Sequence, residues 1–423
     1  MIVAAIILLF LAMVALGFPI FVAMAVSGMT GGLLLGDSYN LLQNTSLGLY
    51  QSFTSFELIA VPLYILVGTL MERAQLSAKL FDFARVWFGS VRGGLGVATI
   101  VACGLFAAIS GSSVATAATI GIVALPLLRE RGYGAEFSGA MIAAGGTLGI
   151  LIPPSIAMIV FGVITEQSIG ALFIAGVVPG LLLAIAFAVY VALFSGVAAE
   201  NVQGWGERLA AARRAAGALV LPVFIFGSIY SGLATPTEVA ALAVAYVAVL
   251  GLTTGALSLQ GLVSASLDAA RTTVMIFLLV GCGRILTEFF TLSEMPQIAA
   301  GYVTDLGWSR LLVVTCVILL ILLLGMFLEA LSMILVLVPI LFPIMMALGF
   351  DPLAFGIFMV LSVEAALITP PVGINLFMLC QIGQMNILRI SKRALIYLGL
   401  MIALMYLVLF VPEIATWLPS TMN

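Results

Sequence analysis

The sequence predicts an all-α polytopic membrane protein built from two inverted repeats, and three observations support this fold class. Hydrophobic residues make up 64% of the 423 residues and charged residues only 8%, whereas soluble domains devote about 25% of their residues to charge. The apolar residues form long unbroken runs, which excludes the alternating pattern of a transmembrane β-barrel. Proline and glycine landmarks also recur at one constant offset. This composition excludes a soluble enzyme, a secreted disulfide scaffold and a nucleic-acid-binding protein.

The repeat has an offset of 217 residues, which relates four landmarks in the two halves of the chain. The corresponding positions are Pro19 and Pro236, Pro126 and Pro343, Gly139 and Gly356, and Pro153-Pro154 and Pro370-Pro371. The text around the last pair is similar as well, LGILIPPSI against AALITPPVGI. Apolar sequences resemble one another by chance, but four landmarks at one offset favour a duplicated transporter fold.

Each half is predicted to contain the same elements in the same order. In the first repeat, residues 1–195, apolar segments give way to a basic amphipathic stretch, two short apolar arms around a polar tip, and a segment broken by two prolines. The expected elements are scaffold helices 1–72, an arm 73–92, a hairpin 93–128, a broken helix 137–164 and a long helix near 168–195. A polar cytoplasmic linker, 196–213, follows. In the second repeat, 214–423, we expect scaffold helices 214–290, an arm 291–309, a hairpin 310–347 and a broken helix 354–380.

The basic residues predict the topology, because cytoplasmic loops carry an excess of Lys and Arg. Basic residues flank both ends of the 93–128 pair, so this pair should enter and leave on the cytoplasmic side as a re-entrant hairpin. Each half then has five crossings, an odd number, and the second half must be inverted. Residues 73–92 and 196–214 should be cytoplasmic, and 36–55 and 291–309 periplasmic. This arrangement places all of the 15 basic residues except Arg284 and Arg310 in cytoplasmic loops.

The hairpin tips and the proline breaks are the candidate site. Broken helices are unfavourable in lipid unless they line a protein-enclosed or watery cavity, and each proline removes a backbone donor and frees carbonyl oxygens. The tips hold Ser110 to Ser113 in one half and Gly325 to Ser332 in the other. Oxygens that converge from a tip and a break suit sodium, although an ordinary proline kink is the alternative. Helix N-termini beyond them would attract a carboxylate.

Several side chains near the tips could bind substrate or ions. Hydroxyl groups could donate hydrogen bonds to a substrate, although small polar residues also serve close helix packing. Intramembrane carboxylates are usually functional. The candidate substrate-binding residues are Ser113, Thr116, Ser155 and Glu329, and Glu364 is a further carboxylate of interest.

Other polar residues have structural interpretations. Arg284 and Glu288 have the i, i+4 spacing of an ion pair, and Trp205, Trp308 and Trp417 are expected at the membrane interfaces. The chain has no His and no C-x-x-C pair among its four Cys residues, so imidazole metal sites are excluded and free thiols are expected. No nucleophile–base pair or phosphate-binding loop is present either, which argues against an enzyme or a primary pump.

Five segments resemble a known family. They are GLFAAISGSSVATAATIG, GGTLGILIPPSI, LATPTEVAAL, GMFLEALSMILVLVPILFP and LITPPVGINLF. They are similar to the large membrane subunit (DctM/SiaM-like) of TRAP, or tripartite ATP-independent periplasmic, transporters, and the resemblance covers essentially the whole chain. It implies an elevator-type secondary transporter in the inner membrane of a bacterium or archaeon, driven by a sodium gradient and without a cofactor.

The resemblance also implies partners and ion sites. The partners are a small four-helix membrane subunit (DctQ/SiaQ-like), expected to be a separate chain, and a periplasmic substrate-binding protein (DctP/SiaP-like). The substrate is an organic anion such as a C4-dicarboxylate, a sialic acid or a 2-oxo acid. The implied ligands are Ser110, Gly111, Ser112, Ser113, Gly145, Gly149 and Pro153 for the first sodium, and Gly325, Glu329, Ala330, Thr369, Pro370, Val372 and Gly373 for the second. Ser362-Val363-Glu364 departs from the family pattern, which leaves the second set open. A stand-alone sodium–dicarboxylate symporter of similar architecture is the alternative.

Overall fold

Most of the residues that the structure describes are helical. The described residues are 1–36, 38–74, 76–199 and 203–422 of a computed structural model, and no strand occurs among them. Seven of the described helices are long and apolar enough to cross a membrane, or eight if the pair bent by 42° at residues 151–156 is counted as one span. The architecture is therefore that of a polytopic α-helical membrane protein, as the composition predicts.

The helices of the first half follow the predicted order, with one addition. They are α1 (Ile2–Ala15), α2 (Ile20–Leu34), α3 (Ser38–Thr54), α4 (Ala60–Arg73), α5 (Leu76–Phe88), α6 (Gly94–Ser110), α7 (Ser113–Glu130), α8 (Ala135–Leu151), α9 (Ile156–Thr165) and α10 (Ile169–Phe194), with a short 3-10 helix η1 (Glu57–Ile59) before α4. The addition is α3, which occupies the polar segment that the sequence predicts only to be periplasmic. Its sequence mixes polar and apolar residues, so composition alone does not distinguish it from a loop.

The second half repeats this order. Its helices are α11 (Trp205–Tyr230), α12 (Pro236–Thr253), α13 (Leu259–Leu292), α14 (Met295–Asp305), α15 (Arg310–Leu324), α16 (Ala330–Ala347), α17 (Pro352–Ala366), α18 (Ile374–Gly383), α19 (Ile387–Phe410) and α20 (Glu413–Thr416), followed by the 3-10 helix η2 (Pro419–Thr421). The bounds of α7 and α16 differ by the 217-residue offset at both ends. Helix α11 begins inside the segment 196–213, so the second part of the expected linker is helical.

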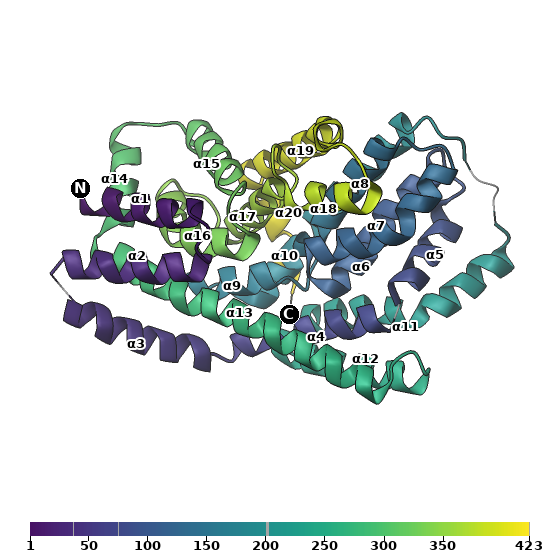
Figure 1. Cartoon of the computed structure of the whole chain (residues 1–423), viewed down its shortest axis with the longest axis horizontal. Coiled ribbons are helices and arrows are strands. Elements are labelled where there is room, and N and C mark those ends of the chain that lie inside the picture. The colour runs from purple at the N-terminus through teal and green to yellow at the C-terminus, as the bar shows by residue number, and fades with distance from the viewer. Residues whose placement is uncertain (37, 75, 200–202, 423) are drawn as a thin grey trace.

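The two halves are interlocked rather than side by side. Helix α7, from the first hairpin, packs against α18, which follows the break of the second half. In the same way α16, from the second hairpin, packs against α9, which follows the first break. Figure 1 shows the hairpins and broken helices of both halves gathered in one body. Each tip is therefore completed by elements of the opposite repeat.

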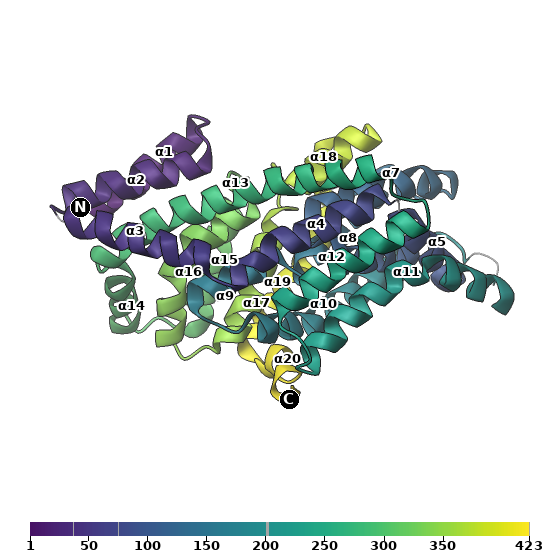
Figure 2. The same ribbon diagram turned by 90° about the horizontal axis from the view of Figure 1, so that it is seen from below.

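The scaffold is organised around α13, a helix of 34 residues that corresponds to both α3 and α4 of the first half. In Figures 1 and 2, α13 extends from the end of the molecule that holds α2 and α3 toward α4 and α12, and it packs against α2, α3 and α4. Helix α12 packs against α4, and α11 against α5. The hairpin helices meet these scaffold helices through α6, which packs on α5 and α4, and through α16, which packs on α13.

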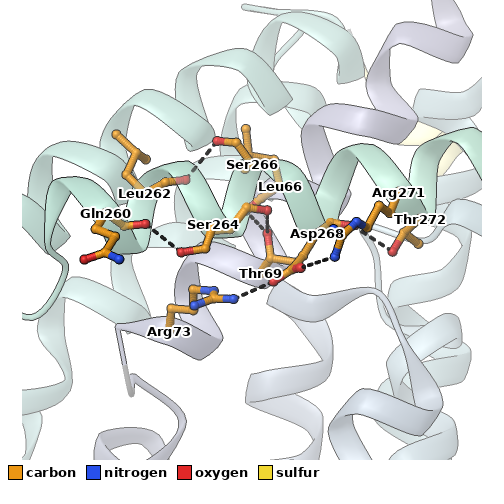
Figure 3. A network of polar contacts seen from close by, with 11 residues as sticks. Leu66, Thr69, Arg73, Gln260, Leu262, Ser264, Ser266, Asp268, Arg271 and Thr272 are labelled. Carbon is orange, nitrogen blue, oxygen red and sulfur yellow. Dashed lines mark hydrogen bonds and ion pairs between the residues drawn. The ribbon is translucent and has the colours of Figure 1, made fainter.

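A polar network joins α4 to α13 at one end of the scaffold (Figure 3). Arg73 pairs with Asp268 at 2.5 Å, and Arg271 lies 3.8 Å from the same carboxylate. The Thr69 hydroxyl, one turn earlier, donates to Leu66 O at 3.0 Å. Because the side chains of Arg73 and Asp268 are both about 40% exposed, the pair contributes at most about 1 kcal/mol. Its main effect is to hold the last turn of α4 against α13.

The topology can be tested with two exposed positions. Arg92 lies in the basic segment after α5, and Tyr302 lies on α14; both are exposed. If the predicted topology is correct, Tyr302→Cys reacts with a membrane-impermeant thiol reagent in intact cells, whereas Arg92→Cys reacts only after the membrane is permeabilised. Both variants are made without the four native cysteines. Labelling of position 92 from outside would contradict the inverted-repeat topology.

Candidate functional site

The first hairpin tip is a two-residue turn that rests on the first proline break. Gly111 has φ of 59°, in the left-handed region that favours glycine. A Cβ at this position would lie 2.7 Å from the carbonyl oxygen of Pro154, so only glycine allows this approach. The next residue, Ser112, is the N-cap of α7, and its hydroxyl accepts from the Ala115 amide at 3.3 Å. The sequence therefore places the tip directly against the break.

The hydroxyl groups of the first tip are largely bonded to one another. The Thr116 hydroxyl donates to Ser112 O at 2.7 Å, and lies 2.9 Å from the Ser110 hydroxyl. Since a hydroxyl has a single proton, Ser110 is the donor in the second contact. Thr116 is fully buried. This network rigidifies the turn and directs the Ser112 carbonyl into α7.

Glycines of α8 allow the tip to pack closely. A Cβ on Gly149 would lie 2.8 Å from Ser112 O and 3.1 Å from Ser113 N, so α8 touches the backbone of the tip at this residue. Gly145, one turn earlier, faces the Cys103 thiol of α6 instead, at 2.9 Å from its Cβ position. Pro153 lies against Gly176 of α10, with its Cδ at 3.4 Å from that Cβ position. The structure thus brings Gly149 to the tip, whereas Gly145 faces α6 and Pro153 lies against α10.

The second tip also ends in a polar N-cap residue, which carries a carboxylate in place of a hydroxyl. Glu329 is the N-cap of α16 and is equivalent to Ser112 by the 217-residue offset. Its Oε1 accepts from the Ser332 hydroxyl at 3.2 Å. Gly325 ends α15, and a Cβ there would overlap the Ala366 side chain at the end of α17. Like the first tip, the second packs against the broken helix of its own repeat.

The second break differs from the first in its capping. Ser155 caps α9 by accepting from the Met158 amide at 3.3 Å, whereas α18 begins after Gly373 with no side-chain cap. Gly373 has φ of 45°. The Thr369 hydroxyl donates back to Ala365 O at 2.7 Å, and Val372 is 42% exposed. The backbone at this break is consequently less covered than at the first.

A cavity of about 370 Å³ lies where the tips, the breaks and the scaffold meet. We call it the central cavity. The first tip contributes Ser110 to Ala115, the second Glu329 to Leu331, and the scaffold contributes α4 and α13. The other lining residues are Ile65, Gly68, Thr69, Glu72, Phe106, Ile150, Ile156, Ala157, Thr272, Met275, Ile276, Leu367 and Ile374. The scaffold touches the tip directly, since a Cβ on Gly68 would lie 3.2 Å from Ser110 O.

Six of the residues named as ion or substrate ligands line the central cavity. They are Ser110, Gly111, Ser112, Ser113, Glu329 and Ala330. The remaining ion-site residues lie behind the tips or at the breaks, namely Gly145, Gly149, Pro153, Gly325, Thr369, Pro370, Val372 and Gly373. Thr116 and Ser155 are fully buried outside the lining. Because their hydroxyls hold the tip and cap α9, the geometry favours a structural role for these two rather than substrate contact.

Asn375 joins the two repeats at the site, and our sequence analysis did not identify it. It lies in the first turn of α18 and is fully buried. Its Nδ2 donates to the Ser113 hydroxyl at 2.8 Å and to Ala143 O at 3.4 Å, while its Oδ1 has no hydrogen-bond partner in the described structure. The available signal was a polar amide directly after PPVGI, in a segment that is otherwise apolar.

Two predictions about intramembrane charges have different outcomes. The Arg284–Glu288 ion pair is wrong, because Glu288 instead accepts from Asn44 Nδ2 of α3 at 3.0 Å and, in the described part of the chain, forms no pair with Arg284. The reason is the added helix α3, which brings a donor to Glu288. Glu364 is fully buried in α17, and neither of its carboxylate oxygens accepts a hydrogen bond from a described residue.

The chain is similar in sequence to known transport proteins. The chain is 37% identical over 401 residues to the C4-dicarboxylate TRAP transporter large permease protein DctM of Pseudomonas aeruginosa, with 93% of each chain covered. It is 33% identical to the sialic acid TRAP transporter large permease protein SiaM of Vibrio cholerae (86% of this chain, 87% of the relative). It is also 32% identical to the ectoine TRAP transporter large permease protein TeaC of Halomonas elongata (95% of each).

The fold resembles that of a solved transporter. The YdaH transporter of Alcanivorax borkumensis, described as having an unusual topology, superposes with a TM-score of 0.66 over 89% of this chain and 88% of that chain, at 16% identity. The model of the family described as the tripartite ATP-independent periplasmic transporter, DctM component, matches residues 7–414. The chain therefore belongs to the DctM family: it is a large permease subunit of a TRAP transporter, a multi-span protein of the bacterial inner membrane and not an enzyme.

Proposed function

We propose that this permease imports an organic anion, driven by a sodium gradient, after delivery by a periplasmic binding protein. The observation that carries the proposal is the set of helix ends at the central cavity. The first residues of four helices line it: Ser113 of α7, Ile156 of α9, Ala330 of α16 and Ile374 of α18. Each helix N-terminus carries partial positive charge and free amide donors. Four such ends around one cavity favour a carboxylate.

The charges of the lining support sodium as the coupling ion. Among the described lining residues the charged ones are Glu72 and Glu329, and none is basic. An anion bound here therefore has no fixed cation to neutralise it, whereas sodium ions at the tips would supply positive charge. The Glu329 carboxylate, with the serine oxygens of the first tip, provides the hard oxygen ligands that such ions prefer. We propose the ion ligands named above, centred on Ser112 at one tip and Glu329 at the other.

The relatives support the substrate class and the partners. Those compared above are named for transport of C4-dicarboxylates, sialic acid and ectoine, each of which carries at least one carboxylate. We propose that this chain acts with a small membrane subunit and a soluble binding protein, as the tripartite family name indicates.

Uptake into proteoliposomes tests the proposal. The permease is reconstituted with its copurifying membrane subunit, and uptake of labelled succinate, sialate and pyruvate is measured with and without the binding protein. We expect uptake of one of these anions to require the binding protein and to rise with sodium with a Hill coefficient above one, because two ion sites act together. Uptake unchanged when choline replaces sodium would contradict sodium coupling. Robust uptake without the binding protein would indicate a stand-alone symporter.

A further inference from the structure

A second cavity, which the proposed function does not use, lies between the scaffold helices and the end of α9. It has a volume of about 600 Å³, within the range of small-molecule sites. Its walls come from η1 and Gly48 of α3, from the α9–α10 turn, from the start of α12, and from Arg284 of α13. Arg284 lies 16 residues beyond Asp268 on α13, or about 24 Å along the helix. We call this space the Arg284 cavity.

Arg284 is the basic residue of this lining, and no described residue forms a polar contact with it. It is half-buried, and its Nε has no exposed surface. Within the described ranges the guanidinium makes neither a hydrogen bond nor an ion pair. It lies close to α3, where a Cβ on Gly48 would be 2.7 Å from Nε. A buried guanidinium nitrogen without a hydrogen bond is unfavourable, and an anionic ligand would provide that bond.

The other charged residues of the cavity leave Arg284 available. Glu57 and Glu166 also line it, but both are exposed to solvent and neither pairs with Arg284. The start of α12 is capped by its own residues, since the Thr235 amide donates to Glu238 Oε2 at 2.8 Å and the Glu238 amide donates to the Thr235 hydroxyl at 3.3 Å. The Thr237 hydroxyl is also bonded, to Phe56 O at 3.2 Å. Arg284 is therefore the group in this cavity that can bind an anion.

Two helices, α9 and α13, border both cavities. Helix α9 borders the central cavity with Ile156 and Ala157 and the Arg284 cavity with Gly162 and Val163. Helix α13 borders the central cavity as far as Ile276, which is eight residues, or about 12 Å, from Arg284. A ligand at Arg284 would therefore lie near the last turn of α9, whereas the central cavity lies at the first turn of that helix.

We propose that Arg284 forms an outer binding site for an organic carboxylate, which occupies it before reaching the central cavity. The guanidinium offers paired N–H donors that match a carboxylate. The predicted topology places this site on the periplasmic side, where the cargo arrives. The inference rests on the proposed function, because it takes the cargo to be an organic anion. The exposed Glu57 and Glu166 lower the affinity of the site, which favours onward movement of the anion.

Kinetics of the complete transporter test the site. Arg284→Gln, Arg284→Lys and the control Arg310→Gln are compared for whichever of succinate, sialate and pyruvate the wild type transports. Arg310 is exposed and its Cζ lies 5.5 Å from the centre of the Phe350 ring, away from both cavities. We expect Arg284→Gln to raise KM about tenfold or more with the maximal rate changed less than about twofold. Lysine should restore most of the loss, and Arg310→Gln should resemble the wild type.

Chemical labelling of the wild-type complex gives a test that needs no substitution. Phenylglyoxal modifies arginine, and peptide mass spectrometry reports the rate at Arg284. We expect the transported anion to slow modification of Arg284 but not of Arg310. An unchanged KM in Arg284→Gln together with unprotected labelling would overturn the proposal. So would a reduced maximal rate at unchanged KM that Glu166→Gln reproduces, since that pattern indicates a conformational latch. If the wild type transports no anion, the proposed function fails instead.

Discussion

Gly149→Ala is expected to abolish most sodium-driven uptake while the protein still inserts into the membrane. The added methyl group would lie 2.8 Å from Ser112 O and 2.9 Å from Ser112 C. Both are backbone atoms, so no side chain can rotate away and the tip itself must move. Overpacking of this kind typically costs 1–3 kcal/mol, which corresponds to a loss of about fivefold to 150-fold in ion affinity if the strain falls on the site. Initial uptake rates at several sodium concentrations measure it.

Gly104→Ala is the matched control. Gly104 lies on α6, the first helix of the hairpin whose tip Gly149 contacts. The nearest neighbours of its Cβ position are the methyl groups of Ile152 and Leu148, at 3.6 and 3.8 Å. This is ordinary van der Waals contact, so the same substitution should leave uptake within about twofold of the wild type. Equal uptake by both alanine variants would show that the close approach of α8 to the tip is dispensable.

Asn375→Leu is expected to reduce uptake about tenfold or more at normal copurification with the small subunit. Leucine has a similar volume but cannot donate, which leaves the Ser113 hydroxyl without its partner; Ala143 O keeps its hydrogen bond within α8. A buried group left unpaired costs about 1–3 kcal/mol. Because this amide connects the first tip to the second break, its loss should loosen the tip and raise the sodium concentration that gives half-maximal uptake.

A double-mutant cycle with Ser113→Ala isolates the contact. Groups that interact directly show coupling energies of about 0.5–3 kcal/mol, so the combined variant should be less impaired than the sum of the two single variants. Ser138→Ala is the control, since Ser138 is also fully buried and its hydroxyl has no described hydrogen-bond partner. Additive effects of Asn375→Leu and Ser113→Ala would contradict a functional role for this bridge.

The sequence predicts the repeated elements well because proline and glycine mark their ends. The 217-residue offset relates the bounds of α7 and α16, and the two-residue turn at Gly111 falls within the predicted polar tip. The sequence pattern does not indicate which residue each polar side chain bonds to. The carboxylate of Glu288 has the spacing to reach Arg284 within one helix, yet it binds Asn44 on α3. A local spacing rule does not account for a helix that arrives from 244 residues away in the chain.

The same reasoning applies to the hydroxyl groups of the site. Thr116 and Ser155 are hydroxyl residues beside a tip and a break, which is the pattern expected of substrate ligands. Their positions as fourth residue after Ser112 and as N-cap of α9 let the backbone take their hydrogen bonds. Asn375 was overlooked because its role depends on α18 packing against α7 of the other repeat. Interactions between the repeats are the part of the site that a linear sequence conceals.

The interlocking of the repeats also determines when the protein can finish assembling. The Ser113–Asn375 contact joins residues 262 positions apart, and ribosomes add about 5–20 residues per second, so the first hairpin waits on the order of 13–50 s for its partner. During that interval α7 lacks the cover of α18, and unpaired polar groups are unfavourable in lipid. The insertion machinery must shelter this hairpin until the last tenth of the chain emerges. Truncation after residue 373 should therefore leave the first half of the protein, although complete in sequence, exposed to membrane proteases.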